Sequence, residues 1–127
     1  MNALRNLFRE LDAEARWNGV AAEVQEERRR QDEKWGPQDH EDLPEGMPGG
    51  PAYGSLAGFW KDRNDARVAT GTLAWDGILL EEVYEALEQG NTDNAALREE
   101  LIQVAAVCIA WCEAIDRREN NAGLQTG

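Results

Sequence analysis

The chain has 127 residues, the size of one ordinary domain, and its hydrophobic fraction of 42% is enough for a modest core. A net charge of -12 excludes a broad basic surface of the kind that binds a nucleic acid polymer. The sequence has no long uncharged apolar run, and its charged N-terminus lacks the apolar core of a signal peptide, so we expect no membrane span and a cytoplasmic location.

Two helical segments are expected before the first proline. In residues 1–18, apolar side chains recur at helical spacing, which predicts an N-terminal amphipathic helix. The dipeptide Asn18-Gly19 is expected to end it. Residues 21–35 are rich in helix formers and charge, with few apolar positions, so this second segment should pack through one narrow stripe and Trp35.

Residues 36–54 contain all four prolines of the chain together with several glycines. Such a composition is incompatible with the interior of a helix or strand. A loop of this length in a small domain is usually functional or disordered, and we interpret it as a mobile flap.

The rest of the chain predicts three helices. Residues 55–70 resume a helical pattern, residues 74–89 form a strong helix that stops at Gly90, and a last helix runs from about residue 95 to 118. The tail, residues 119–127, is expected to be frayed. No segment shows the alternation of a strand. The expected fold is therefore a single all-α domain spanning residues 1–127, an antiparallel bundle of four to five helices completed by oligomerisation.

The last helix carries the most apolar run of the chain, LIQVAAVCIAWC, over residues 101–112. A helix that is apolar all round is expected to be buried in a bundle. Cys108 and Cys112 lie four residues apart on one face of it, where their bonds do not converge as a disulfide requires. We interpret them as thiols of the core.

Carboxylates recur at helical spacing on both sides of a short turn. Glu82 and Glu85 are three residues apart on one helix, and Glu100 and Gln103 are three apart on the next. Each pair shares one face of its helix, and a short turn makes the two helices antiparallel neighbours. Glu100 is directed between two valines, towards the interior, where a lone carboxylate is costly unless it is paired or metal-bound.

The pattern alone leaves two interpretations of these carboxylates open. The first is a site for a hard cation such as Mg²⁺, or Mn²⁺ in its place, because both prefer oxygen ligands. The second is a structural ion-pair network with arginines such as Arg98.

The arrangement EEVYE, a turn, then EELIQ resembles the MazG-like, all-α nucleoside triphosphate pyrophosphohydrolases, whose pattern is EExxE followed by ExxD. The segments ERRRQDEKWGPQDH, WDGILLEEVYEAL and LREELIQVAAVCIAW are similar to the small phage and bacterial members, so the resemblance covers roughly residues 20 to 116. It implies cleavage between the α and β phosphates of a nucleoside triphosphate, giving a monophosphate and pyrophosphate.

The resemblance also implies roles for individual residues. Glu82, Glu85, Glu100 and Gln103 correspond to metal ligands, and Glu81 and Glu82 to catalytic carboxylates. Gln103 stands where the family has an Asp, so this chain has one negative charge fewer at that position. We expect Gln103 to limit metal affinity and the rate. Family members resembling this chain are dimers or tetramers, which favours a homodimer or homotetramer.

Substrate contacts are expected from three residue types. A lysine would clamp phosphate, a tryptophan would stack on a base, and a glutamine would read the edge of the base. The candidates are Gln31, Lys34, Trp35, Gln38, Lys61 and Trp75. A different class of function also fits the composition, namely an acidic helical interaction module without catalysis, whose carboxylates would face outward and bind no metal.

Overall fold

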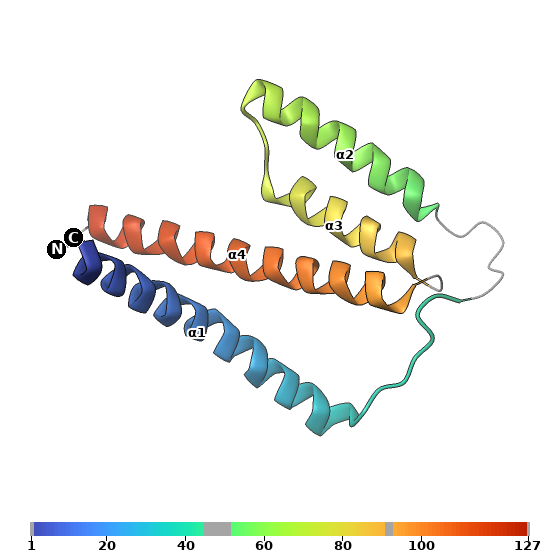
Figure 1. Ribbon diagram of the computed structural model, residues 1–127, viewed down its shortest axis with the longest axis horizontal. Helices are drawn as coiled ribbons and strands as arrows, with labels where there is room; N and C mark the ends of the chain where they lie inside the picture. Colours follow the sequence, from blue (N-terminus) through green and yellow to red (C-terminus); the bar gives the residue numbers. More distant parts are fainter. Residues whose placement is uncertain (1, 45–51, 91–92, 127) are drawn as a thin grey trace. The chain divides into compact units, whose positions relative to one another are not determined.

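The computed structural model describes residues 2–44, 52–90 and 93–126, and these form four helices without a strand, so the expected all-α fold is confirmed (Figure 1). They are α1 (Asn2–Trp35), α2 (Tyr53–Thr70), α3 (Trp75–Gln89) and α4 (Asn94–Thr126). The chain divides into two compact units. The α1 unit contains residues 1–39 and 112–127, and the α2–α3 unit contains residues 40–111.

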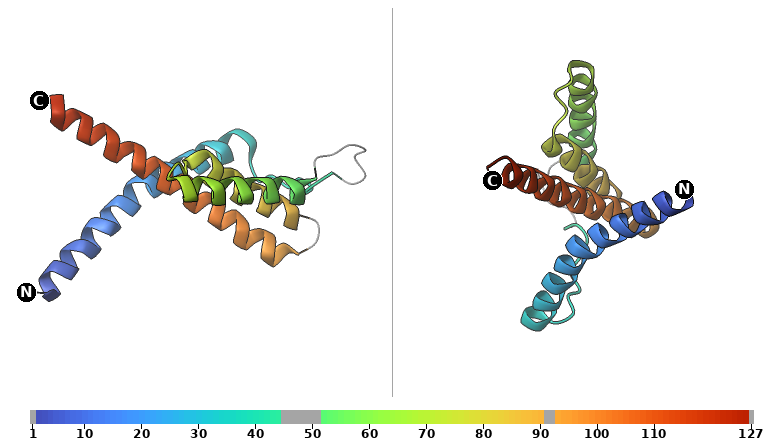
Figure 2. Two further views of the ribbon diagram at one scale, coloured as in Figure 1. Left: turned by 90° about the horizontal axis from the view of Figure 1, so that it is seen from above. Right: turned by 90° about the vertical axis from the view of Figure 1, so that its left-hand side faces the viewer.

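In the α1 unit, α1 is one continuous helix of 34 residues (Figure 2). The expected end of a first helix at Asn18-Gly19 is therefore wrong. Helix-forming residues flank this dipeptide on both sides, and one glycine inside a long helix costs only about 1 kcal/mol, which is too little to break it. Its C-terminal half carries exposed ion pairs three or four residues apart, such as Arg28–Asp32 at 2.9 Å.

The Pro/Gly-rich loop begins where expected and ends slightly earlier. Gly36, with φ of 66°, follows α1 directly, and its N–H donates to the carbonyl of Asp32 at 2.8 Å. Residues 36–44 are not helical, and α2 starts at Tyr53, two residues before the predicted end of the loop. The part of the proposed flap formed by residues 45–51 lies outside the described residues.

The α2–α3 unit is built on a helical hairpin. Figure 1 shows that the chain reverses between α2 and α3 and again before α4, so that α3 lies beside α2 and antiparallel to it. The first reversal is made by Gly71, whose φ of 70° is left-handed and whose N–H donates to the carbonyl of Val68 at 3.2 Å. The N-cap residue of α3 is Ala74, which makes no side-chain capping hydrogen bond.

Small residues let α2 and α3 approach each other closely. Ala57 of α2 and Ala86 of α3 are buried, with 6% and 1% of their surfaces exposed. The rings of Tyr53 and Tyr84 stack across the pair, with centroids 6.4 Å apart. Further along the unit, Trp75 and the α4 residue Trp111 stack at 6.0 Å, with ring planes 10° apart.

The last helix differs from the expectation in two ways. The helix continues to Thr126, so residues 119–126 are helical, whereas a frayed tail was expected there. Residue 127 is not described. No proline interrupts it, and an established helix extends with little further cost. Its apolar run is also not buried all round, since Leu101 is 49% exposed and Ile102 57% exposed.

The core thiols expected at Cys108 and Cys112 are exposed instead. Both lie on the same outward face of α4 as Leu101, because residues 101, 108 and 112 are seven and four positions apart. The apolar run of α4 extends around the whole helix, and the neighbouring helices of this chain cover only part of that apolar surface. None of the described helices is long and apolar enough to cross a membrane.

Candidate metal centre

Three glutamates of α3 gather on the side of the helix that faces the rest of the α2–α3 unit. Glu81, Glu82 and Glu85 each contribute one carboxylate oxygen to a group in which these atoms lie within 4.8 Å of one another. All three side chains are half-buried. The sequence places them here because residues 81, 82 and 85 are one and four positions apart, which brings them to adjacent directions on a helix.

The position of these carboxylates raises their proton affinity. Burial raises the pKa of Glu82, and the nearby charges of Glu100 and Glu81 raise it further. Burial likewise raises the pKa of Glu85 to about 7, with added contributions from the charges of Glu82, Glu81 and Glu100 and from a hydrogen bond with Glu81. Near neutral pH the group therefore gains from any partner that supplies positive charge.

Two carboxylate oxygens at this site are buried and have no hydrogen-bond partner among the residues that the structure describes. They are Oε2 of Glu82 and Oε2 of Glu100, and they come from α3 and α4 respectively. Glu100 is half-buried, in agreement with its expected inward direction. Buried carboxylate oxygens without donors are unfavourable unless a proton or cation reaches them. The oxygen-only set formed by Glu81, Glu82, Glu85 and Glu100 fits a hard divalent cation such as Mg²⁺ or Mn²⁺.

Gln103 does not share the environment of Glu100. It was expected on much the same face of α4, next to Glu100, but it is exposed. At 100° per residue, three residues correspond to 300°, so the side chains of Glu100 and Gln103 point in directions about 60° apart around α4. This difference is enough for one side chain to face inward and the other outward. Its assignment as a metal ligand stays a prediction.

One residue of this site was not anticipated from the sequence. Asn64 of α2 is 7% exposed, and its side-chain Nδ2 donates to Oε1 of Glu81 at 3.0 Å and to the carbonyl of Gly77 at 2.9 Å. Within KDRNDARV, a charged stretch of α2, nothing marks Asn64 as buried. The one available signal was Gly77, a glycine inside a strongly predicted helix, which often indicates close approach by another group.

Two of the substrate-binding candidates lie in the same unit as the carboxylates. Lys61 lies one turn before Asn64 on α2, where it is exposed and pairs with Asp65 at 3.6 Å. Trp75 is half-buried and one face of its ring is occupied by Trp111. The side chain of Lys61 is therefore accessible to a phosphate, whereas Trp75 has at most one ring face for a base.

The other four candidates belong to the α1 unit, and their part in a substrate site stays a prediction. Gln31 accepts a hydrogen bond from Arg28 at 2.7 Å, and the ammonium of Lys34 lies 4.8 Å from the ring centre of Trp35. Gln38 follows in the loop after α1. Lys34 and Trp35 are both exposed, as a phosphate clamp and a stacking platform would have to be.

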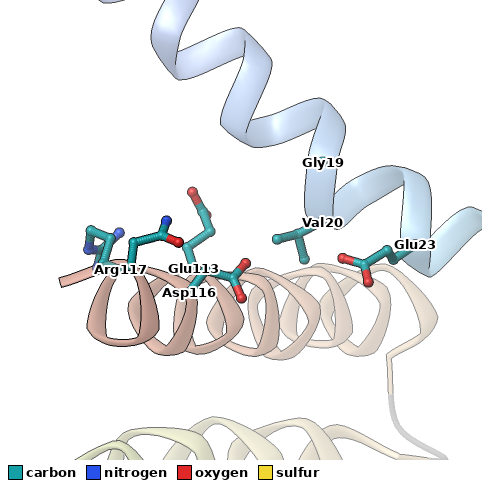
Figure 3. A pocket seen from close by; sticks show the side chains of 7 residues that line it. Gly19, Val20, Glu23, Glu113, Asp116 and Arg117 are labelled. Atoms are coloured by element: carbon teal, nitrogen blue, oxygen red, sulfur yellow. The ribbon is translucent and has the colours of Figure 1, made fainter. Parts of the chain in front are cut away.

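A separate hollow of about 300 Å³ lies within the α1 unit, between α1 and the C-terminal part of α4 (Figure 3). It is lined by Gly19, Val20, Glu23, Glu113, Asp116, Arg117 and Asn120. Glu23 and Asp116 are exposed, and among the described side chains of this unit no buried polar atom lacks a partner. These acids therefore resemble a solvated surface more than the group on α3.

The sequence matches no protein-family model, no curated protein and no solved structure.

Proposed function

We propose that the protein is a metal-dependent nucleoside triphosphate pyrophosphohydrolase that cleaves the bond between the α and β phosphates. The observation that carries this proposal is the pair of buried, unpartnered oxygens of Glu82 and Glu100 beside the raised pKa of Glu85. These carboxylates are arranged to receive positive charge. The resemblance to MazG-like enzymes supplies the substrate class and the reaction.

The proposed mechanism assigns each carboxylate a role. Glu82, Glu85 and Glu100 would hold Mg²⁺, with Gln103 as a further expected ligand. The bound cation would neutralise phosphate charge and lower the pKa of an attacking water. Glu81, whose carboxylate accepts a hydrogen bond from Asn64, would orient that water and accept its proton. Of the two expected substrate-binding residues in this unit, Lys61 carries the positive charge and would contact the departing pyrophosphate.

Burial favours this function over a non-catalytic interaction module. A module that binds a basic partner through its carboxylates needs them exposed, as rim charges are in protein interfaces. Glu81, Glu82, Glu85 and Glu100 are all half-buried, and two of their oxygens are inaccessible. The exposed acids of α1 are mostly engaged with arginines of the same helix.

Self-association forms part of the proposal. The buried apolar residues among the described part of the chain are Val20, Ala57 and Ala86 alone, a very small core for a domain of this size. The outward face of α4 exposes Leu101 and Ile102 in addition to the two cysteines. A second copy that covers this face would bury it, and a homodimer or homotetramer follows.

The experiment that tests the function is a panel of nucleoside triphosphates incubated with the protein and Mg²⁺, with detection of released pyrophosphate. At least one triphosphate should give a monophosphate and pyrophosphate. Glu85→Gln and Glu100→Gln should lose the activity, whereas Glu88→Gln and Glu99→Gln, which change exposed acids of the same two helices, should keep it. Release of inorganic phosphate in place of pyrophosphate, or equal activity in all variants, would disprove the assignment.

A further inference from the structure

We propose that Asn64 is a positioning residue of the metal centre: its amide fixes the carboxylate of Glu81 from α2 without neutralising the charge of that carboxylate. The inference rests on the proposed metal centre and adds to it a residue of another helix. Its basis is the hydrogen bonding and burial of Asn64, together with the shape of α3 opposite.

The orientation of the Asn64 amide is determined by its partners. Nδ2 carries two N–H groups, and both meet acceptors, the carbonyl oxygen of Gly77 and the carboxylate of Glu81. Gly77 and Glu81 are four residues apart on α3, so their acceptors lie one above the other on one face. A flipped amide would place an oxygen against both acceptors and lose both bonds.

The opposing surface of α3 is shaped to admit this amide. A Cβ atom at Gly77 would lie 2.1 Å from Oδ1 of Asn64 and 3.2 Å from a guanidinium nitrogen of Arg67. Any side chain at position 77 would therefore push Asn64 away from Glu81. Gly77 is buried in a helix interior, where glycine is otherwise unfavourable, so its presence is explained by the close approach of Asn64.

The arrangement costs stability. Oδ1 of Asn64 is buried and has no hydrogen-bond partner within the described ranges 2–44, 52–90 and 93–126. A buried unsatisfied acceptor is unfavourable, and an apolar side chain of similar shape would avoid this cost. The gain that offsets it lies at Glu81. A neutral donor orients one carboxylate oxygen and leaves the negative charge available to a cation, which an arginine or lysine at position 64 would cancel.

The hydrogen bond between Asn64 and Glu81 affects the metal centre because Glu81 lies within the group of carboxylates on α3. One oxygen of Glu81 accepts a hydrogen bond from Nδ2 of Asn64, and a carboxylate oxygen of Glu81 lies within 4.8 Å of carboxylate oxygens of Glu82 and Glu85. Fixing Glu81 from α2 therefore fixes the spacing of the carboxylates on α3. Groups that orient metal ligands in this way typically affect metal affinity by about 10- to 100-fold.

The test is calorimetric titration of the full-length protein with Mn²⁺, together with melting of the metal-free protein. Asn64→Leu and Gly77→Ala should each raise the Kd for Mn²⁺ by about tenfold or more. The melting temperature of metal-free Asn64→Leu shows whether the variant folds, because leucine removes the orphaned Oδ1 but also the donor of two hydrogen bonds, so the Kd of the folded variant decides the positioning role. Thr70→Val, which removes an exposed hydroxyl of the same helix that bonds to backbone carbonyls and to Thr72, should leave the Kd unchanged.

A purely structural role predicts an unchanged Kd for Mn²⁺ in folded Asn64→Leu, whatever the melting temperature of the metal-free variant, and this result overturns the inference. Asn64→Ala, which adds no bulk, decides the same question if Asn64→Leu does not fold. If the wild-type protein binds no Mn²⁺, the metal centre itself is wrong and the role of Asn64 is lost with it. Binding by the wild type and equally by the folded variants contradicts only the positioning role.

Discussion

At the scale of single residues, the carboxylates of α3 and α4 are placed where their negative charges destabilise the metal-free folded protein. Burial and mutual repulsion raise the pKa of Glu82 and Glu85, and two buried oxygens lack donors. A structural ion-pair network would have supplied an arginine. Arg98, the arginine considered for that role, is exposed on α4. The described residues thus leave an oxygen-lined group whose free energy falls when a proton or a cation arrives.

The raised pKa values predict how stability changes with pH. The pKa of Glu85 is about 7 in the folded protein, above its ordinary value of 4.5, so between these pH values the folded state binds more protons than the unfolded state. The free energy of unfolding of the metal-free protein therefore falls as pH rises through this window. Its melting temperature should be lower at about pH 7.5 than at about pH 5.5.

Two variants test whether Glu85 causes this decrease of the melting temperature with rising pH. Glu85→Gln should flatten the decrease, and Glu88→Gln, at an exposed position of α3, should not. The pKa values of Glu26 and Asp76 are lowered, so these groups titrate below the window and do not contribute. A melting temperature that rises from about pH 5.5 to about pH 7.5 would contradict the conclusion that burial and charge repulsion raise the pKa of Glu85.

At the scale of helices, the sequence predicts what is local and misses what depends on neighbours. The limits of α3 and the start of the loop at Gly36 follow from glycine positions and helical periodicity. The continuity of α1 across Asn18-Gly19 was missed, because the penalty of one glycine is small compared with the length of the helix. The carboxylates of α3 were found because their spacing lies within one helix, whereas Asn64 reaches them across the α2–α3 pair, and no single-helix pattern encodes that contact.

Two glycines of the α2–α3 unit, one inside α2 and one at its C-cap, should respond oppositely to the same substitution. Gly71 has a φ of 70°, so Gly71→Ala should destabilise the protein by about 1 kcal/mol. Gly58 lies in α2, and a Cβ there would meet nothing within 4 Å, so Gly58→Ala should stabilise it by about 0.5–1 kcal/mol. Denaturant titrations of both variants measure the two signs. Equal effects of both substitutions would contradict the left-handed cap at Gly71.

At the scale of the whole molecule, apolar side chains exceed what the described part of the chain buries. Only three apolar residues are buried, while eleven large hydrophobic residues are exposed, among them Leu101, Ile102 and Ile115 of α4. A monomer rarely leaves so much apolar surface in contact with water. The last helix was expected to be buried on the basis of its composition, and we propose that a second copy of the chain covers its exposed apolar face.

Self-association should depend on the outward face of α4. Sedimentation of the wild-type protein at micromolar concentration should give a species of at least twice 14.2 kDa. Ile102→Glu should shift it towards the monomer, because the new charge would have to be buried in the contact. Glu99→Lys, which changes an exposed charge three residues earlier on the same helix, serves as the control. A wild-type protein that sediments as a 14.2 kDa species would contradict the oligomer.

The central claim is that Glu100 of α4 and the glutamates of α3 hold one divalent cation, and calorimetric titration with Mn²⁺ tests it most directly. The wild type should bind Mn²⁺, Glu100→Gln should bind it at least about tenfold more weakly, and Glu99→Gln, which removes the same charge from the adjacent exposed position, should bind as the wild type does. Equal affinity in Glu100→Gln and Glu99→Gln, or no binding by the wild type, would contradict the account.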